Sequence, residues 1–148
     1  MTEAADAALW AAYLRTVYEA HTPFGRIAIR VGQRAPLLDQ LLGRTGDRAW
    51  CFLTAWNPRS EPLSAGENAE RNAELRRALD AEGYRVLADA RGLPAAPSWQ
   101  PEASFLVLGI ERDAAIRLAR RFGQNAVVWG RLGAPAELVD CRERGDAR

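Results

Sequence analysis

The sequence predicts a single α+β domain whose core is a ferredoxin-like split βαβ sandwich. Its 148 residues, 48% of them apolar and 26% charged, suit one globular domain with one hydrophobic core. Between residues 49 and 130 the patterns read strand, helix, strand, strand, helix, strand, which is the element order of that fold. The two most apolar strands begin near Ala49 and Ala103. The split βαβ topology places these two strands in the centre of the sheet.

We expect one domain over residues 1–148. Its core spans residues 48–140, and residues 1–45 contribute an N-terminal helix, an extra strand and a short helix that pack on the core. A mixed α/β sheet, in which the N-terminal strand also pairs with the main sheet, fits the same pattern. The sequence leaves these two architectures open.

The N-terminal elements are predicted from the spacing of apolar residues. They recur at helical intervals from Glu3 to about Glu19, which predicts a first helix with one broad apolar stripe. Residues 26–31 alternate apolar with polar or small side chains, so we expect a short edge strand there. Residues 36–42 are predicted to form a short helix that begins with a proline and ends at Gly43.

The first half of the core contains a strand, a loop and a long helix. Residues 49–56 are a run of strand-forming residues and are predicted to form a central strand that is covered on both faces. Two prolines indicate a loop at residues 57–63. Ser64, followed by Glu67, supplies a capping box, so a helix is expected to start here and run to about Glu82.

The second half of the core contains the longest predicted loop, at residues 89–101, where one glycine and three prolines oppose regular structure. This loop separates a strand at residues 84–88 from the second central strand at residues 103–110. The remaining predicted elements are a helix at residues 111–122, stopped by Gly123, and strands at residues 125–130 and 136–139.

Three segments of this core resemble a family of bacterial proteins known as domain of unknown function 3293. They are FLTAWNPRSEPLS with the ENAERNAEL that follows it, PEASFLVLGIERDAA, and RRFGQNAVVWG. The resemblance covers roughly residues 48–131. It implies a stand-alone globular domain, and it transfers no reaction to this chain.

Charge and cation type exclude several classes of function. Lys and Arg together number 20 against 19 Asp and Glu, so the formal net charge is +1 and no overall field attracts nucleic acid. Every cation is an arginine, which excludes the P-loop lysine and Schiff-base chemistry. We expect no nucleic-acid partner. The arginine and alanine excess is typical of a GC-rich bacterial genome.

The residues that most often hold metals or act as nucleophiles are few. Cys51 and Cys141 each lie in an apolar run and are predicted to be buried core thiols. The only histidine, His21, is placed in a turn before Pro23, so neither a metal site nor a catalytic triad is expected. We therefore assign no catalytic residue, no metal and no cofactor.

The N-terminal stretch is acidic and rich in alanine, with no basic segment followed by an apolar one. No apolar run approaches the roughly 18 residues of a membrane span. We expect a cytoplasmic protein with no membrane partner.

Two asparagines extend the apolar stripe of the long helix. Asn68, Asn72, Leu75 and Leu79 share one face, so the amides should lie buried near the helix start. Such a helix start, beside a strand end, suits a polar or anionic ligand. The candidate ligand-binding residues are Thr54, Trp56, Asn57, Arg59, Ser60, Asn68, Arg71 and Asn72, with a second cluster at Gln124 and Asn125. In the competing interpretation, the asparagines only fix the backbone of the loop at residues 57–63.

Three functions follow, and they stay open. The first is a small non-catalytic domain that binds a polar or anionic small molecule, because amides, arginines and an indole recognise ligands without supplying a general base near pH 7. The second is a protein-interaction module, homodimeric in one version, that uses the first helix or Trp99. The third is an enzyme that uses the carboxylate of Glu67 or Glu102.

Overall fold

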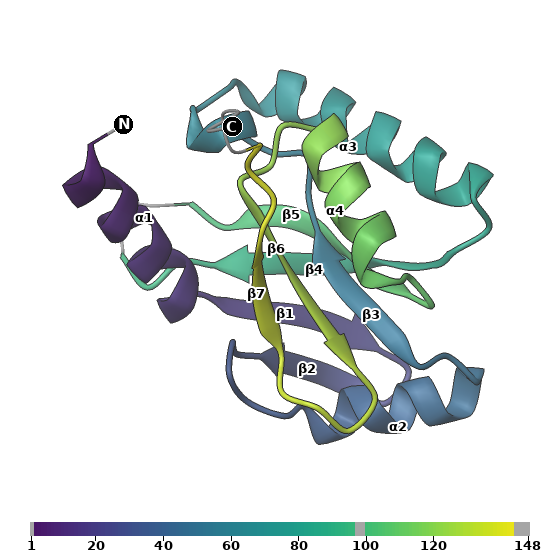
Figure 1. The fold of residues 1–148 in the computed structure, drawn as a ribbon. Coiled ribbons are helices and arrows are strands. Elements are labelled where there is room, and N and C mark those ends of the chain that lie inside the picture. Colours follow the sequence, from purple (N-terminus) through teal and green to yellow (C-terminus); the bar gives the residue numbers. More distant parts are fainter. Residues whose placement is uncertain (1, 97–99, 144–148) are drawn as a thin grey trace.

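The computed structural model describes residues 2–96 and 100–143. In this part of the chain, four α-helices surround a seven-stranded antiparallel sheet, so the fold is α+β (Figure 1). The helices are α1 (Glu3–Arg15), α2 (Pro36–Thr45), α3 (Ala65–Ala81) and α4 (Arg112–Arg121), with a 3-10 turn η1 (Pro58–Ser60). The strands are β1 (Val17–Thr22), β2 (Gly25–Ile29), β3 (Ala49–Leu53), β4 (Arg85–Leu93), β5 (Glu102–Leu108), β6 (Ala126–Arg131) and β7 (Glu137–Asp140).

The strands are ordered β2-β1-β4-β5-β3-β6-β7. From β3 to β6 the chain runs strand, helix, strand, strand, helix, strand, as the sequence predicted. Both strands predicted to be central, β3 and β5, lie inside the sheet with neighbours on both sides. The N-terminal strand also joins the main sheet, because β1 pairs with β4, and β2 forms the predicted edge.

The sheet is curled, so one of its faces is concave. Beyond β2, Val31 forms an isolated bridge with Ala136, which directly precedes β7. The Gly32 amide donates to the Ala136 carbonyl at 2.8 Å, and the Ala136 amide donates to the Gln33 carbonyl at 3.0 Å. These bonds join the segments that flank the two edge strands. The concave face therefore closes at one end, where α2 lies across it (Figure 1).

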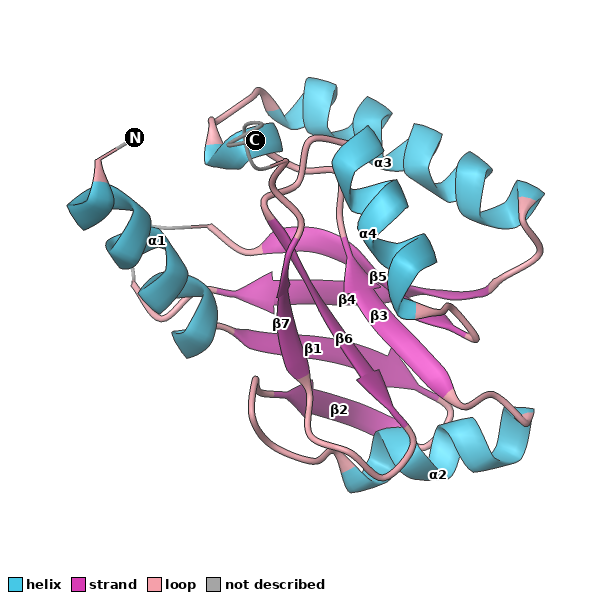
Figure 2. Ribbon diagram, viewed as in Figure 1, coloured by secondary structure: helices cyan, strands magenta, loops and turns pink. Residues whose placement is uncertain are grey.

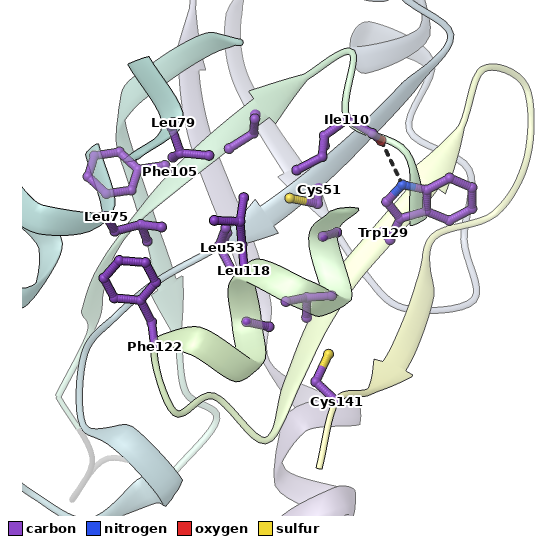
Figure 3. Close-up of a cluster of buried hydrophobic side chains, with 14 of the residues drawn as sticks. Cys51, Leu53, Leu75, Leu79, Phe105, Ile110, Leu118, Phe122, Trp129 and Cys141 are labelled. Atoms are coloured by element: carbon purple, nitrogen blue, oxygen red, sulfur yellow. Dashed lines mark hydrogen bonds between the residues drawn. The ribbon is translucent and has the colours of Figure 1, made fainter. Parts of the chain in front are cut away.

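Two apolar clusters fill the two faces of the sheet. Helices α3 and α4 cover the outer face together (Figure 2), and Leu75, Leu79 and Leu118 pack there against β3 and β5. Figure 3 shows this cluster, in which the Trp129 indole donates to the Ile110 carbonyl at 2.9 Å. On the concave face, leucines of α2 pack against residues that include Ile27, Ile29, Trp50, Leu106 and Leu108.

Cys51 and Cys141 are buried free thiols of the outer cluster, which confirms the prediction of core thiols. Burial raises the pKa of both thiols, that of Cys141 to about 11. Neither thiol is therefore a reactive thiolate at neutral pH.

The predicted end of the first helix is wrong. Helix α1 ends at Arg15, and Val17 begins β1, which runs through the predicted turn at His21. Thr16 has an extended backbone, and its hydroxyl donates to the Ala12 carbonyl at 2.9 Å. Pairing with two strands and an edge-to-face contact between the rings of Tyr18 and Phe52 stabilise the extended form. These long-range contacts override the helical spacing.

The predicted ends of β4 and α2 are also wrong. Strand β4 continues to Leu93, although residues 89–101 were predicted to be a loop, because a β-bulge between Leu87 and Ala90 shifts the register and pairing then resumes. Helix α2 continues through Gly43 to Thr45 and ends instead at Gly46, which has a φ of 77°.

The predicted strand at residues 49–56 stops at Leu53, because the next buried amide, that of Ala55, bonds to a side chain of α3. The capping box at Ser64 and Glu67 is confirmed.

A single buried carboxylate holds the outer side of the N-terminal hairpin. The Glu19 side chain is 4% exposed, and it pairs with Arg26 of β2 and, at 3.2 Å, with Arg91 of β4. His21 Nε2 lies 3.4 Å from the same carboxylate. The hydrogen bond from Arg26 is the main cause that lowers the pKa of Glu19, although burial acts in the opposite direction.

We predict that Gly130→Ala destabilises the fold. A Cβ at Gly130 would lie 2.7 Å from two ring atoms of Trp50, which is itself buried in the concave face. Overpacking of this kind costs about 1–3 kcal/mol, which urea unfolding can measure. Gly66→Ala is the control, because nothing lies within 4 Å of a Cβ there and Ala suits a helix better than Gly. Equal stability of the two variants contradicts the packing described here.

Candidate functional site

A cavity of about 770 Å³ lies between α1 and the concave face of the sheet, beyond the part that α2 covers. Its size falls within the range of small-molecule sites. The residues that line it include Ala8, Ala12, Tyr13, Arg15, Thr16, Tyr18, Phe52, Thr54, Trp56, Asn57, Ser60, Leu63, Asn68, Gly92, Gln100, Glu102, Ser104, Gln124, Ala126, Val128 and Leu138.

The cavity exists because small side chains occupy this part of the concave face. Gly92 of β4 pairs with Tyr18 on one side and with Glu102 on the other. A Cβ at Gly92 would meet nothing closer than the methyl of Thr16, at 3.7 Å. The next position on β5 that faces the same way is Ser104, which is also small. Space therefore remains open between the larger side chains.

Helix α1 forms the roof of the cavity and is held mainly by polar contacts. The Tyr13 hydroxyl is hydrogen-bonded to the Ser60 hydroxyl at 2.9 Å, and the Asn125 amide donates to the Tyr13 hydroxyl at 3.3 Å. Nearer the helix start, Arg142 pairs with Asp6 and its guanidinium lies 5.0 Å from the centre of the Trp10 ring. Part of the apolar stripe of the first helix, including buried Leu9, thus faces its own domain, whereas Leu14 is 50% exposed.

The two helix asparagines bond to backbone groups. Asn68 bonds to the loop at residues 57–63, as the competing interpretation proposed, whereas the backbone partners of Asn72 lie outside that loop. Asn72 Oδ1 accepts the Ala55 amide at 2.8 Å, and its Nδ2 donates to the Ala103 carbonyl at 2.9 Å. Asn68 Oδ1 accepts the Asn57 amide, also at 2.8 Å. Both side chains are buried. They fix the chain that leaves β3, and Asn68 lines the cavity as well.

Three polar side chains form a hydrogen-bonded chain that ends at a carboxylate. Asn68 Nδ2 donates to Asn57 Oδ1 at 2.8 Å. Asn57 Nδ2 then donates to Glu102 Oε2 at 3.3 Å. The Asn57 backbone has a left-handed φ of 43°, a conformation that asparagine tolerates better than most residues. Sequence reasoning named no partner for Glu102, and the structure supplies Asn57.

Glu102 is half-buried in the cavity wall. Burial raises the pKa of its carboxyl group, and the hydrogen bond from Asn57 offsets part of that effect. In residues 2–96 and 100–143, no arginine forms an ion pair with Glu102. The cavity therefore contains a carboxylate whose charge the described protein does not neutralise.

The structure brings six of the ten predicted site residues to the cavity wall, namely Thr54, Trp56, Asn57, Ser60, Asn68 and Gln124. The other four, Arg59, Arg71, Asn72 and Asn125, are not among the lining residues. Arg71 Nε donates to the Ala55 carbonyl at 2.8 Å and its Nη2 to the Phe122 carbonyl, so this guanidinium joins two loops.

Sequence reasoning missed the residues that the roof and β1 contribute, above all Tyr13 and Tyr18. Tyr18 was assigned to the helix, and its hydroxyl donates to the Tyr13 carbonyl at 3.2 Å. Gly92 was the one sequence signal for the cavity, because a glycine within a strand often marks a site where a ligand or another backbone approaches closely. Trp99, for which a role as a partner anchor was one of two open interpretations, lies outside the described residues.

No set of three or more His, Cys, Asp or Glu side chains in the described part of the chain could hold a metal ion. Among the described helices, none has the length and apolar character needed to cross a membrane.

We predict that Asn72→Ala lowers the free energy of unfolding by about 1–3 kcal/mol, because the buried Ala55 amide loses its acceptor. Urea unfolding measures the change. Glu70→Ala, at an exposed position of the same helix, is the control and should change stability by no more than about 0.5 kcal/mol. Equal effects would show that Asn72 does not hold the end of β3.

We predict that Glu102→Gln stabilises the protein at neutral pH, since Gln keeps an acceptor for Asn57. The pKa of Glu102 is raised on folding, so the wild type loses stability as the pH rises from the unfolded pKa through the folded one. The variant lacks this loss. Its advantage in urea midpoint should be absent near pH 4, which lies below the ordinary pKa of Glu, and present at pH 7, which lies well above it. Lower stability of the variant at neutral pH contradicts an uncompensated carboxylate.

The sequence model of one family, described as protein of unknown function (DUF3293), matches residues 53–127. The match is half of the chain, and the chain belongs to this family. It contains Glu102 and all six predicted residues that line the cavity, but not helix α1. No curated protein and no solved structure matches the chain.

Proposed function

We propose that this member of the DUF3293 family is a binding domain for a polar small molecule and that the cavity under α1 is its site. One observation carries the proposal. A cavity of about 770 Å³ combines an apolar wall, formed by Phe52, Val128 and Leu138, with a hydrogen-bonded carboxylate at Glu102. Ligand sites are concave and mostly apolar, with a few polar groups that fix orientation.

The arrangement supports a polar ligand better than an anionic one. The two arginines that the sequence assigned to the site do not line the cavity, and Arg71 is bonded to backbone carbonyls. The one carboxyl group among the described lining residues is Glu102, which repels an anion. Arg15 is the one arginine among the described lining residues, and it lies at the exposed C-terminal end of the roof helix, where solvent screens its charge.

Binding is favoured over catalysis because the described lining holds neither a thiol nor an imidazole. Glu102 is bonded to an amide, and an amide does not exchange a proton with substrate near neutral pH. The groups present recognise and orient a molecule.

The strand order β4-β5-β3-β6 supports a ferredoxin-like split βαβ core. Each neighbouring pair in this set is antiparallel, and α3 and α4 pack on the same face. In this assignment, the β1-β2 hairpin and β7 extend the core on its two sides. Both additions contribute to the curl that encloses the cavity.

A cytoplasmic location in a bacterium completes the proposal. Two buried thiols that remain free suit a reducing compartment. The arginine-rich, lysine-free composition suits a GC-rich bacterial genome.

A thermal-shift screen of nucleosides, sugars, amino acids, amines and small acids tests this function. A ligand at a hundred times its Kd stabilises the fold by about 2.7 kcal/mol, a shift of several degrees. We expect hits with the wild type and none with Gly92→Leu, whose side chain would contact Thr16 and Tyr18 and occupy part of the cavity. Gly66→Ala, on α3, should retain every hit. Hits that shift Gly92→Leu as much as the wild type contradict the cavity as the site.

A further inference from the structure

We propose that the ligand is an amphiphilic organic cation, in which an ammonium or amidinium group pairs with Glu102 and an apolar group packs on Phe52, Val128 and Leu138. This inference rests on the proposed function and names the ligand class of the same site. It starts from the geometry of Glu102. Oε2 accepts one hydrogen bond, from the Asn57 amide at 3.3 Å, and no described residue donates to Oε1.

The same chain provides a direct comparison for this carboxylate. Glu19 is also removed from solvent, and there the protein supplies two guanidinium groups, from Arg26 and Arg91. Asp140 likewise pairs with Arg142, at 2.8 Å. The sequence is rich in arginine, so a partner for Glu102 would be easy to provide. No arginine of the described residues pairs with Glu102, which lines a cavity instead and is open there to a partner that binds.

The position of Glu102 makes its carboxylate accessible to a ligand. It begins β5 directly opposite Gly92, and the missing side chain of Gly92 keeps the neighbouring surface open. Beyond Gly92 in the same row lies Tyr18, whose ring meets that of Phe52 with centroids 5.3 Å apart. Aromatic rings attract cations, and they pack equally well on an apolar group.

The hydrogen bonds around Glu102 hold its carboxylate ready for a cation. Asn57 is fixed by Asn68 and by the Leu63 amide, which donates to Asn57 Oδ1 at 3.0 Å. Asn57 can therefore present only its Nδ2 group to Glu102. A bound ammonium group would add a charge-assisted hydrogen bond and would favour the ionised carboxylate.

Matched compounds that differ only in charge test the ligand class. Benzylamine, benzyl alcohol and benzoate share one ring, and butylamine, butanol and butyrate form an aliphatic set. Calorimetric titration and thermal shift are carried out with the wild type, Glu102→Gln and Glu61→Gln. The last variant removes an exposed carboxylate that does not line the cavity.

We expect the amines to bind the wild type about tenfold or more tightly than the matched alcohols, with the acids weakest. Glu102→Gln should abolish this preference, and Glu61→Gln should retain it. Amine affinity should fall as the pH is lowered through the pKa of Glu102, and affinity for the alcohols should not.

Amines and alcohols that bind the wild type equally, or a preference for amines that persists in Glu102→Gln, overturn the cation and leave the proposed function standing. Tighter binding of the acids than of the amines would likewise overturn the cation and leave the proposed function standing. If no compound of either set binds the wild type, and the wider screen has no hit that Gly92→Leu removes, both the cation and the proposed function are wrong.

Discussion

The curl of the sheet is the constraint on which the rest of the structure depends. The bridge between Val31 and Ala136 joins the segments next to the two edge strands, so the concave face becomes an enclosed space. Helix α2 fills one end of that space with leucine side chains. The other end has Gly92 and Ser104 where larger residues would be needed to fill it. A flat sheet with the same strand order would have two open faces and no cavity.

The position of the Glu102 carboxylate in this cavity is better explained by a binding role than by a contribution to fold stability. An ionised group in a partly buried position costs stability unless it is paired, and Glu102 receives only one amide hydrogen bond from the described chain. Buried Asn68 acts on this carboxylate indirectly: it orients the Asn57 amide, which donates a hydrogen bond to Glu102. Binding sites commonly keep such groups at a cost in stability. The same hydrogen bonds that hold the loop after β3 therefore also set the chemistry of the cavity.

Local signals predicted the elements between β3 and β6 well. The capping box at Ser64, the apolar run from Ala49 and the buried face that contains Asn68 are each encoded by residues that lie close together in the chain. Long-range pairing was invisible to this reasoning. Tyr18 has helical spacing, yet it lies in a strand that pairs with β2 on one side and with β4 on the other. No local signal placed α1 over the cavity. The sequence indicated where the polar residues gather, and it could not show that Arg71 would be bonded to backbone carbonyls.

The most direct test of an open cavity on the concave face is the unfolding free energy of Ala126→Leu beside that of Ala90→Leu. Both alanines belong to strands of this sheet, but Ala126 lines the cavity, whereas Ala90 is 7% exposed in the packed cluster. We expect Ala126→Leu to match or exceed the wild type, and Ala90→Leu to lose about 1–3 kcal/mol through overpacking. An equal loss in both variants would contradict the cavity, and with it the site that this account places there.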